Sequence, residues 1–191
     1  YQQLLQYMGK KLGRPVQLVQ RPTYAEMNEL VKDRQVEVAF VCSLAYVEGK
    51  SDFNMELLVA PRVRGTVTYN SYLIVPADSS ATRLEDLRGK VFAFTDPLSN
   101  SGRLAPTYEL ARISEKPETF FRSYIFTYNH DYSIQAVADR RVDGAAVDSL
   151  IYDYLVAVNS PLTRKTKVVA SWGPYGIPPV VVYPDLDISL K

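Results

Sequence analysis

Hydrophobic and polar positions along this chain follow two spacings, one typical of amphipathic helices and one typical of buried strands. Leu4, Leu5, Met8 and Leu12 recur at helical spacing, whereas Val36 to Val41 is an apolar, β-branched run. We predict helices over residues 1–12, 23–33, 84–88, 103–112, 131–140 and 149–158. We predict strands over 15–20, 36–41, 91–94, 124–127, 142–147, 167–170 and 180–183, and extended segments over 57–63 and 66–75.

Capping residues mark some of these boundaries. Thr23 and Glu26 have the T-x-x-E spacing of a capping box, in which each residue bonds the other's backbone N–H. Gly13 and Gly89 stand where a glycine ends a helix. These signals predict a helix start at residue 23 and helix ends near residues 12 and 88.

The alternation of helices with strands predicts an α/β architecture with mixed, mostly parallel sheets. The pattern falls into two units that extended segments join, so we expect two lobes with a ligand cleft between them. Lobe 1 is residues 1–68 with 175–191, lobe 2 is residues 75–168, and the hinge crossings are 69–74 and 169–174.

Composition excludes several classes of protein. Hydrophobic residues make up 47% and charged residues 23% of the 191 positions, which are globular values. The net charge is +1 with no basic run, so we expect no nucleic-acid partner. No apolar run approaches the roughly 20 residues of a membrane span. Cys42 is the single cysteine, which excludes an internal disulfide, and no paired Cys/His spacing indicates a metal or cofactor.

Polar clusters follow four of the predicted strands. They are Cys42-Ser43, Asp96 to Gly102, Asn129-His130-Asp131 and Asp148-Ser149. In open α/β sheets ligands bind beyond the carboxyl ends of the strands, so we expect these clusters to meet at one cleft. The segment from Phe94 to Gly102 leads from a strand into a helix, which is the geometry of an anion site as well as of an ordinary helix cap.

The same residues leave alternatives open. Ser99 and Ser101 are either ligand donors or helix caps, and Asp148 is either a ligand contact or the cap of the following helix. His130, the single histidine, would add charge to an oxyanion contact near neutral pH if it were protonated. A catalytic triad is disfavoured because His130 and Asp131 are adjacent and would not align as base and orienting group. We expect a protein that is not an enzyme.

The order of several motifs resembles one known family. The motifs are Thr23-Tyr24-Ala25, Val38-Ala39-Phe40, Ser71 to Val75, Leu84 to Lys90, Asp96 to Gly102, His130, and Val142 to Asp148. Together they resemble the phosphonate-binding (PhnD-like) solute-binding proteins of bacterial ABC importers. The resemblance implies a two-lobed periplasmic-binding-protein fold of type II that closes on its ligand by a hinge.

The resemblance also implies a set of ligand contacts. The oxyanion contacts would be Tyr24, Ser99, Asn100, Ser101 and His130, with Tyr69 as an aromatic residue near the cleft. Asn100 stands where the family commonly has Thr, and its amide can still donate a hydrogen bond. The acidic residues that hold an ammonium group in some members fall at Leu150 and near Pro178 here, with Asp131 and Asp148 as possible substitutes. We therefore expect phosphate, phosphite or a small alkylphosphonate as ligand.

The resemblance also implies which elements this chain lacks, where the protein is located and which partner it has. Relatives begin with a strand before the first helix and end with further helices, so both elements are expected to be missing from this chain. The expected location is periplasmic or otherwise extracytoplasmic, in a bacterium. The expected partner is the permease of an ABC transporter or, as the alternative, an attached signalling module for which this domain is the sensor.

Overall fold

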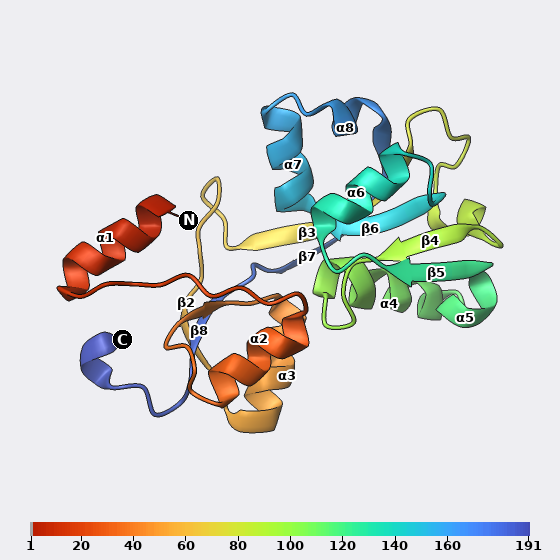
Figure 1. The fold of residues 1–191 in the computed structure, drawn as a ribbon. Coiled ribbons are helices and arrows are strands. Elements are labelled where there is room, and N and C mark those ends of the chain that lie inside the picture. The colour runs from red at the N-terminus through yellow and green to blue at the C-terminus, as the bar shows by residue number, and fades with distance from the viewer. Residues whose placement is uncertain (1) are drawn as a thin grey trace.

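The chain folds around two β-sheets, and the computed structural model describes residues 2–191 of it. The smaller sheet contains β1 (Ala39–Phe40), β2 (Glu56–Val59) and β8 (Val180–Val182). The larger sheet contains β3 (Thr68–Pro76), β4 (Val91–Phe94), β5 (Ser123–Phe126), β6 (Gly144–Asp148) and β7 (Thr166–Gly176). Each sheet carries its own helices, which gives the molecule two lobes (Figure 1).

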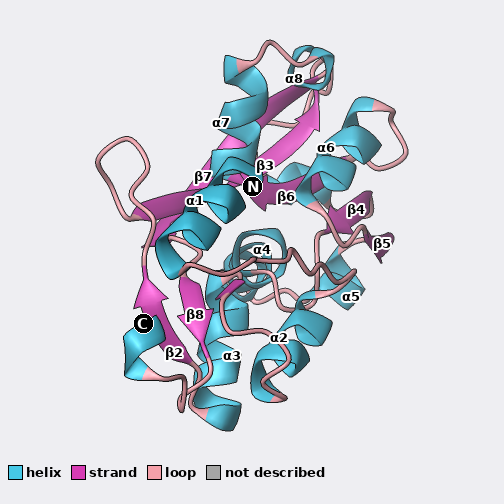
Figure 2. Ribbon diagram, turned by 60° about the vertical axis from the view of Figure 1, so that its left-hand side comes forward, coloured by secondary structure: helices cyan, strands magenta, loops and turns pink. Residues whose placement is uncertain are grey.

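Helices fill most of the segments between the strands. The α-helices are α1 (Gln2–Leu12), α2 (Tyr24–Lys32), α3 (Ser43–Phe53), α4 (Ala105–Arg112), α5 (Pro117–Phe120), α6 (His130–Ala138), α7 (Ser149–Ala157) and α8 (Pro161–Arg164). Shorter helical turns are η1 (Leu84–Leu87), η2 (Asn100–Leu104) and η3 (Ile188–Leu190). In Figure 2, α2 and α3 lie beside β2 and β8, whereas α6 and α7 lie with the larger sheet. Within the described residues, no helix has the length and apolar character needed to cross a bilayer.

The sheets are mixed, but the expectation of mostly parallel pairing is wrong. The strand orders are β1-β8-β2 and β5-β4-β6-β3-β7. Parallel pairing is confined to β4 with its neighbours β5 and β6. All other described ladders are antiparallel, namely β8 with β1 and β2 in the smaller sheet and β3 with β6 and β7 in the larger one.

Strands β3 and β7 also connect the two lobes. They pair with each other from Thr68 opposite Gly176 to Pro76 opposite Thr166, and Figure 1 shows both running from between the lobes into the larger sheet. The expected hinge crossings, 69–74 and 169–174, fall inside these two strands. The lobe boundaries themselves stay a prediction.

Several predicted elements are confirmed. The capping box of Thr23 and Glu26 is present and opens α2. Strand β4 has the predicted bounds, and β5, β6, β8, α6 and α7 lie within a few residues of theirs. Helix α1 begins at Gln2, and the predicted first position, Tyr1, lies outside the described residues.

Other predictions are wrong. Residues 15–20 form no strand, and the run 36–41 contains only the two-residue strand β1. The 15–20 segment is mostly exposed and has no partner strand, so its β-type sequence has nothing to pair with. Helix α3 was not predicted, because its apolar and polar residues do not separate onto two faces.

The core of the larger lobe lies on both faces of its sheet, as strand alternation requires. Phe92 and Phe94 point to one face, where the ring of Phe92 stacks on Phe121 with centroids 4.4 Å apart. Ala93 points to the opposite face, with Ile134 and Val147. A third cluster joins α2, α3 and β8 in the smaller lobe and includes the partly buried Leu98 from the larger one.

Candidate ligand-binding site

The four polar clusters that follow strands are joined by hydrogen bonds. The N–H of Asn100 donates to Cys42 Sγ (3.2 Å), which links the larger lobe to the start of α3. Thr95 Oγ1 lies 3.1 Å from His130 Nδ1, and the N–H of Asp148 donates to the same nitrogen (3.2 Å). The expectation that these clusters lie together is therefore confirmed, and the ligand cleft between them stays a prediction.

Strand β4 ends in a tight turn that sets the position of η2. Ser99 Oγ accepts the N–H of Gly102 (2.9 Å) and so acts as the N-cap of η2, which has π-helical geometry. A Cβ at Gly102 would stand 2.3 Å from Thr95 Oγ1, so the close approach of η2 to the end of β4 requires glycine. Asp96 Oδ1 accepts the N–H of Leu98 (2.8 Å) and closes the turn. The capping interpretation of Ser99 is confirmed, and its contact with a ligand stays a prediction.

Ser101 has a different environment from Ser99. Its backbone carbonyl accepts a hydrogen bond from Ser71 Oγ (2.7 Å), which holds this turn of η2 against β3. Its own hydroxyl is fully buried and has no hydrogen-bond partner among the described residues. A buried polar group without a partner costs roughly 1–3 kcal/mol. Such a hydroxyl is suited to bind a ligand that supplies the missing partner.

Asn100 and Tyr69 form a second pair of donors. Asn100 Nδ2 donates to the hydroxyl oxygen of Tyr69 (3.0 Å), and both side chains are buried. Burial raises the pKa of the Tyr69 phenol, which therefore stays neutral. The Tyr69 oxygen accepts from Asn100, and the side chain of Ser43 is a second hydrogen-bonding neighbour of the phenol.

Tyr24 brings the smaller lobe to this site. It is the first residue of α2, and its N–H donates to Asp96 Oδ2 (3.1 Å) across the two lobes. Burial, with Cys42 and Asp96 as neighbours, raises the pKa of the Tyr24 phenol, so this hydroxyl also stays neutral.

His130 is oriented by its neighbours. A backbone N–H can only donate, so Nδ1 accepts the proton of the Asp148 N–H, and the proton of the neutral ring lies on Nε2. Burial lowers the pKa of His130 to about 4. Acceptance of the Asp148 N–H by Nδ1 favours the neutral ring over the protonated one, and Nε2–H would then be a neutral donor.

Asp148 and Asp131 differ sharply. Asp148 is 6% exposed, and its Oδ1 accepts the N–H of Leu150 (2.7 Å), so it caps α7 as the alternative interpretation proposed. Burial raises the pKa of Asp148 to about 6. Asp131 is exposed on the first turn of α6, and its N–H donates to Asn129 Oδ1 (2.8 Å). The structure places Asp148 among the other site residues and Asp131 at the surface, and ligand contact by either stays a prediction.

We call Tyr24, Tyr69, Asn100, Ser101 and His130 the donor cluster. Sequence reasoning missed the residues that support it, namely Ser71, Thr95 and the cross-lobe role of Asp96. Ser71 lies within a predicted extended segment and Thr95 directly follows a predicted strand. Their sequence pattern therefore does not distinguish them from ordinary sheet residues. No arginine or lysine is hydrogen-bonded to the cluster among the described residues, and Arg103 instead packs over the ring of Phe94 (4.5 Å).

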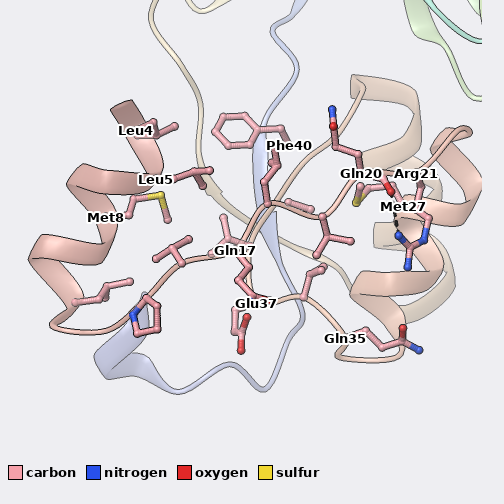
Figure 3. A pocket seen from close by; sticks show the side chains of 18 of the residues that line it. Leu4, Leu5, Met8, Gln17, Gln20, Arg21, Met27, Gln35, Glu37 and Phe40 are labelled. Carbon is pink, nitrogen blue, oxygen red and sulfur yellow. Dashed lines mark hydrogen bonds between the residues drawn. The ribbon is translucent and has the colours of Figure 1, made fainter. Parts of the chain in front are cut away.

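A cavity extends into the smaller lobe, and Tyr24 of the donor cluster is among the residues that line it. Its volume is about 600 Å³, and it lies in the smaller lobe between α1 and the segment that leads to α2. Figure 3 shows Leu4, Leu5 and Met8 on one side of it and Phe40 in the middle. Its lining is largely apolar on the α1 side and also contains exposed polar side chains, among them Arg14 and Arg21. The described residues also contain no group of His, Cys, Asp and Glu side chains that could hold a metal.

The fold matches that of known binding proteins. A binding-protein component of an ABC phosphonate transporter from Pseudomonas aeruginosa superposes with a TM-score of 0.91 at 25% identity, covering 98% of this chain and 64% of that one. PhnD1 from Prochlorococcus marinus, solved in complex with methylphosphonate, has a TM-score of 0.85 at 19% identity, covering 96% and 70%. The class defined by this fold is the two-lobed periplasmic binding protein.

Sequence comparison narrows the class to a family. Residues 1–191 match the family described as the periplasmic substrate-binding protein of phosphonate ABC transporters. The phosphate-import protein PhnD of Mycolicibacterium smegmatis is 33% identical over 162 residues, which cover 79% of this chain and 50% of that protein. The phosphonates-binding periplasmic protein of Escherichia coli is 29% identical over 170 residues, covering 86% and 50%. The chain belongs to this phosphonate-binding family and spans about half the length of these curated relatives.

Proposed function

We propose that this chain binds a small phosphorus oxyanion, namely phosphate, phosphite or an alkylphosphonate, and delivers it to the permease of an ABC importer outside the cytoplasm. The observation that carries the proposal is the buried, unpartnered hydroxyl of Ser101 within the donor cluster. The names of the relatives, which concern phosphate import and phosphonate binding, agree with such a ligand.

Binding would rest on neutral donors rather than on fixed cations. The donor cluster would supply hydroxyl, amide and imidazole protons, from Ser101, Tyr24, Tyr69, Asn100 and the Nε2–H of His130. A hydrogen bond to a charged acceptor is stronger than a neutral one, and exclusion of water strengthens it further. No covalent step is needed, since His130 Nδ1 is engaged by Asp148 and Thr95 rather than by a serine nucleophile.

The lobe arrangement supports capture by closure. Tyr24 belongs to the smaller lobe, whereas Asn100, Ser101 and His130 belong to the larger one, so one bound oxyanion would be held from both sides. We infer that residues 1–68 with 175–191 move against residues 75–168 by bending at the crossings 69–74 and 169–174. Hinge closure around a ligand is a common transition of two-lobed binding proteins.

Two residues, Leu150 and Pro178, affect which substituent the bound oxyanion can carry. Leu150, at the start of α7, and Pro178, just before β8, provide no carboxylate for an ammonium group. A ligand amine placed there would lose its hydration without gaining a charged partner, unless it reached the carboxylate of Asp148. We therefore expect an oxyanion with no substituent or a small apolar one to bind better than 2-aminoethylphosphonate, and the alternative is an amine held by Asp148.

Calorimetric titration with a ligand panel tests this function. The panel is phosphate, phosphite, methylphosphonate, 2-aminoethylphosphonate and sulfate. We expect saturable binding of at least one of the first three, with a Kd well below about 1 mM, and weaker binding of 2-aminoethylphosphonate. Absence of binding by every phosphorus oxyanion would refute the function, and preference for the amine would refute the argument from Leu150 and Pro178.

A further inference from the structure

Asp148 places a buried carboxyl group beside the donor cluster with no cation to balance it. Its side chain is 6% exposed, and the hydrogen bond of Oδ1 is to a backbone N–H rather than to a basic side chain. The titratable groups near it lie on several elements: Tyr24 on α2, Cys42 before α3, Tyr69 on β3, His130 on α6 and Asp153 on α7. A further carboxylate, Asp96, accepts the N–H of Tyr24. None of these groups is a lysine or arginine.

Such an environment is unfavourable for two negative charges. Two acidic groups that share a site cannot both ionise easily, so one of them keeps a proton. An oxyanion held by the donor cluster would lie beside the Asp148 carboxyl, and their repulsion would be weakly screened in a buried site. One proton placed between a ligand oxygen and a carboxyl oxygen would replace this repulsion with a hydrogen bond.

We propose that Asp148 is a specificity-determining residue that shares one proton with the bound oxyanion, so that binding takes up a proton and favours oxyanions able to hold one. This inference rests on the proposed function of the donor cluster. The proton comes from solvent or arrives on the ligand, and only O–H bonds form or break.

The pKa values fit this coupling. Burial raises the pKa of Asp148 to about 6, so protonating its carboxylate is easy near neutral pH. Phosphate-type oxyanions have their second ionisation in the same range, about 6 for a phosphorylated side chain. Because the complex holds more protons than the separate partners, affinity falls as pH rises above these pKa values. Sulfate is fully ionised there and brings no proton, so Asp148 disfavours it.

The test uses calorimetry with methylphosphonate and with sulfate, from mildly acidic to mildly alkaline pH, in two buffers of different ionisation enthalpy. The variant is Asp148→Asn, since Asn caps a helix as Asp does and keeps the start of α7. Asp187→Asn is the matched control, because Asp187 caps η3 by accepting the N–H of Ser189 (2.8 Å) and lies outside the donor cluster. Asp148→Ser, which also keeps a capping side chain, replaces Asp148→Asn if that variant does not fold.

For the wild type we expect net proton uptake and an affinity for methylphosphonate that falls up to about tenfold per pH unit on the alkaline side. Asp187→Asn should behave alike. In Asp148→Asn the uptake should disappear, and sulfate should bind more tightly relative to methylphosphonate.

Three results would overturn the inference while leaving the proposed function intact. The first is methylphosphonate binding by the wild type without proton uptake at a pH above the second ionisation of the ligand. The second is uptake that persists in Asp148→Asn and so belongs to another group such as His130. The third is discrimination against sulfate that the variant leaves unchanged. Failure of phosphate, phosphite and methylphosphonate to bind the wild type at all would instead overturn the proposed function.

Discussion

Ser99 and Ser101 are two positions apart in the same turn and have different roles. Ser99 Oγ accepts the N–H of Gly102 and is part of the local structure, whereas Ser101 Oγ has no partner among the described residues. The sequence could place both residues at a helix entry but could not separate cap from donor. That distinction depends on the π-helical geometry of η2 and on the contact of Ser101 with β3. Neither can be read from the segment Phe94 to Gly102 alone.

Replacement of Ser101 by Ala should separate ligand binding from stability. Loss of a hydroxyl that donates to a charged ligand costs roughly 1–3 kcal/mol, or about 5- to 150-fold in Kd. The free energy of unfolding should stay unchanged or rise slightly, because the variant removes an unsatisfied buried group. Calorimetry and chemical denaturation measure the two effects. Ser79→Ala, which removes a turn hydroxyl bonded to the N–H of Ala81, is the control and should leave Kd unchanged.

If Ser101→Ala bound methylphosphonate as tightly as the wild type, the Ser101 hydroxyl would not be a ligand donor, and the observation that carries the proposed function would lose its meaning.

Among the elements, the turn from β4 into η2 sets most of the site geometry. Gly102 allows η2 to pack against Thr95, and Thr95 in turn contacts His130. A small change in this turn would therefore displace both the serine hydroxyls and the imidazole.

Gly102→Ala tests the importance of this packing. The new Cβ would stand 2.5 Å from Thr95 Cβ and 2.9 Å from Ser99 Oγ, so the turn must shift. Overpacking of a close contact costs typically about 1–3 kcal/mol, and affinity for methylphosphonate should fall as well. Gly176→Ala is the matched control, since no atom lies within 4 Å of its Cβ position. Equal stability of Gly102→Ala and the control in denaturant unfolding would show that the turn tolerates a side chain.

At the same scale, the success of sequence reasoning depended on how local each signal was. The capping box of Thr23 and Glu26 and the buried strand from Val91 to Phe94 are encoded by neighbouring residues, and both were predicted. The 15–20 segment failed because a strand needs a partner, which its own sequence does not reveal. The antiparallel pairing of β3 with β6 and β7 was missed for a related reason, since it depends on the direction in which the chain crosses between lobes.

At the scale of the whole molecule, the two lobes meet through hydrogen bonds at the donor cluster. The Tyr24 N–H donates to Asp96, and the Asn100 N–H donates to Cys42, so both contacts join the lobes beside the proposed ligand position. A ligand bound there would contact both lobes and stabilise them together. Ligand at about 100 times its Kd adds about 2.7 kcal/mol to the free energy of unfolding when it binds only the folded state.

Hydrogen exchange with and without saturating methylphosphonate tests this coupling between lobes. We expect slower exchange at the start of α2 in the smaller lobe, and in η2, α6 and the start of α7 in the larger lobe. At the starts of α2 and α7 the amides of Tyr24 and Leu150 donate to Asp96 and Asp148, which lie beside the proposed ligand position. Amides of α5, at the far end of the larger sheet in Figure 1, should change little and serve as the internal control. Protection confined to the larger lobe would mean that the oxyanion is held by η2 and α6 alone, and Tyr24 would then be a structural residue of α2 with no part in capture.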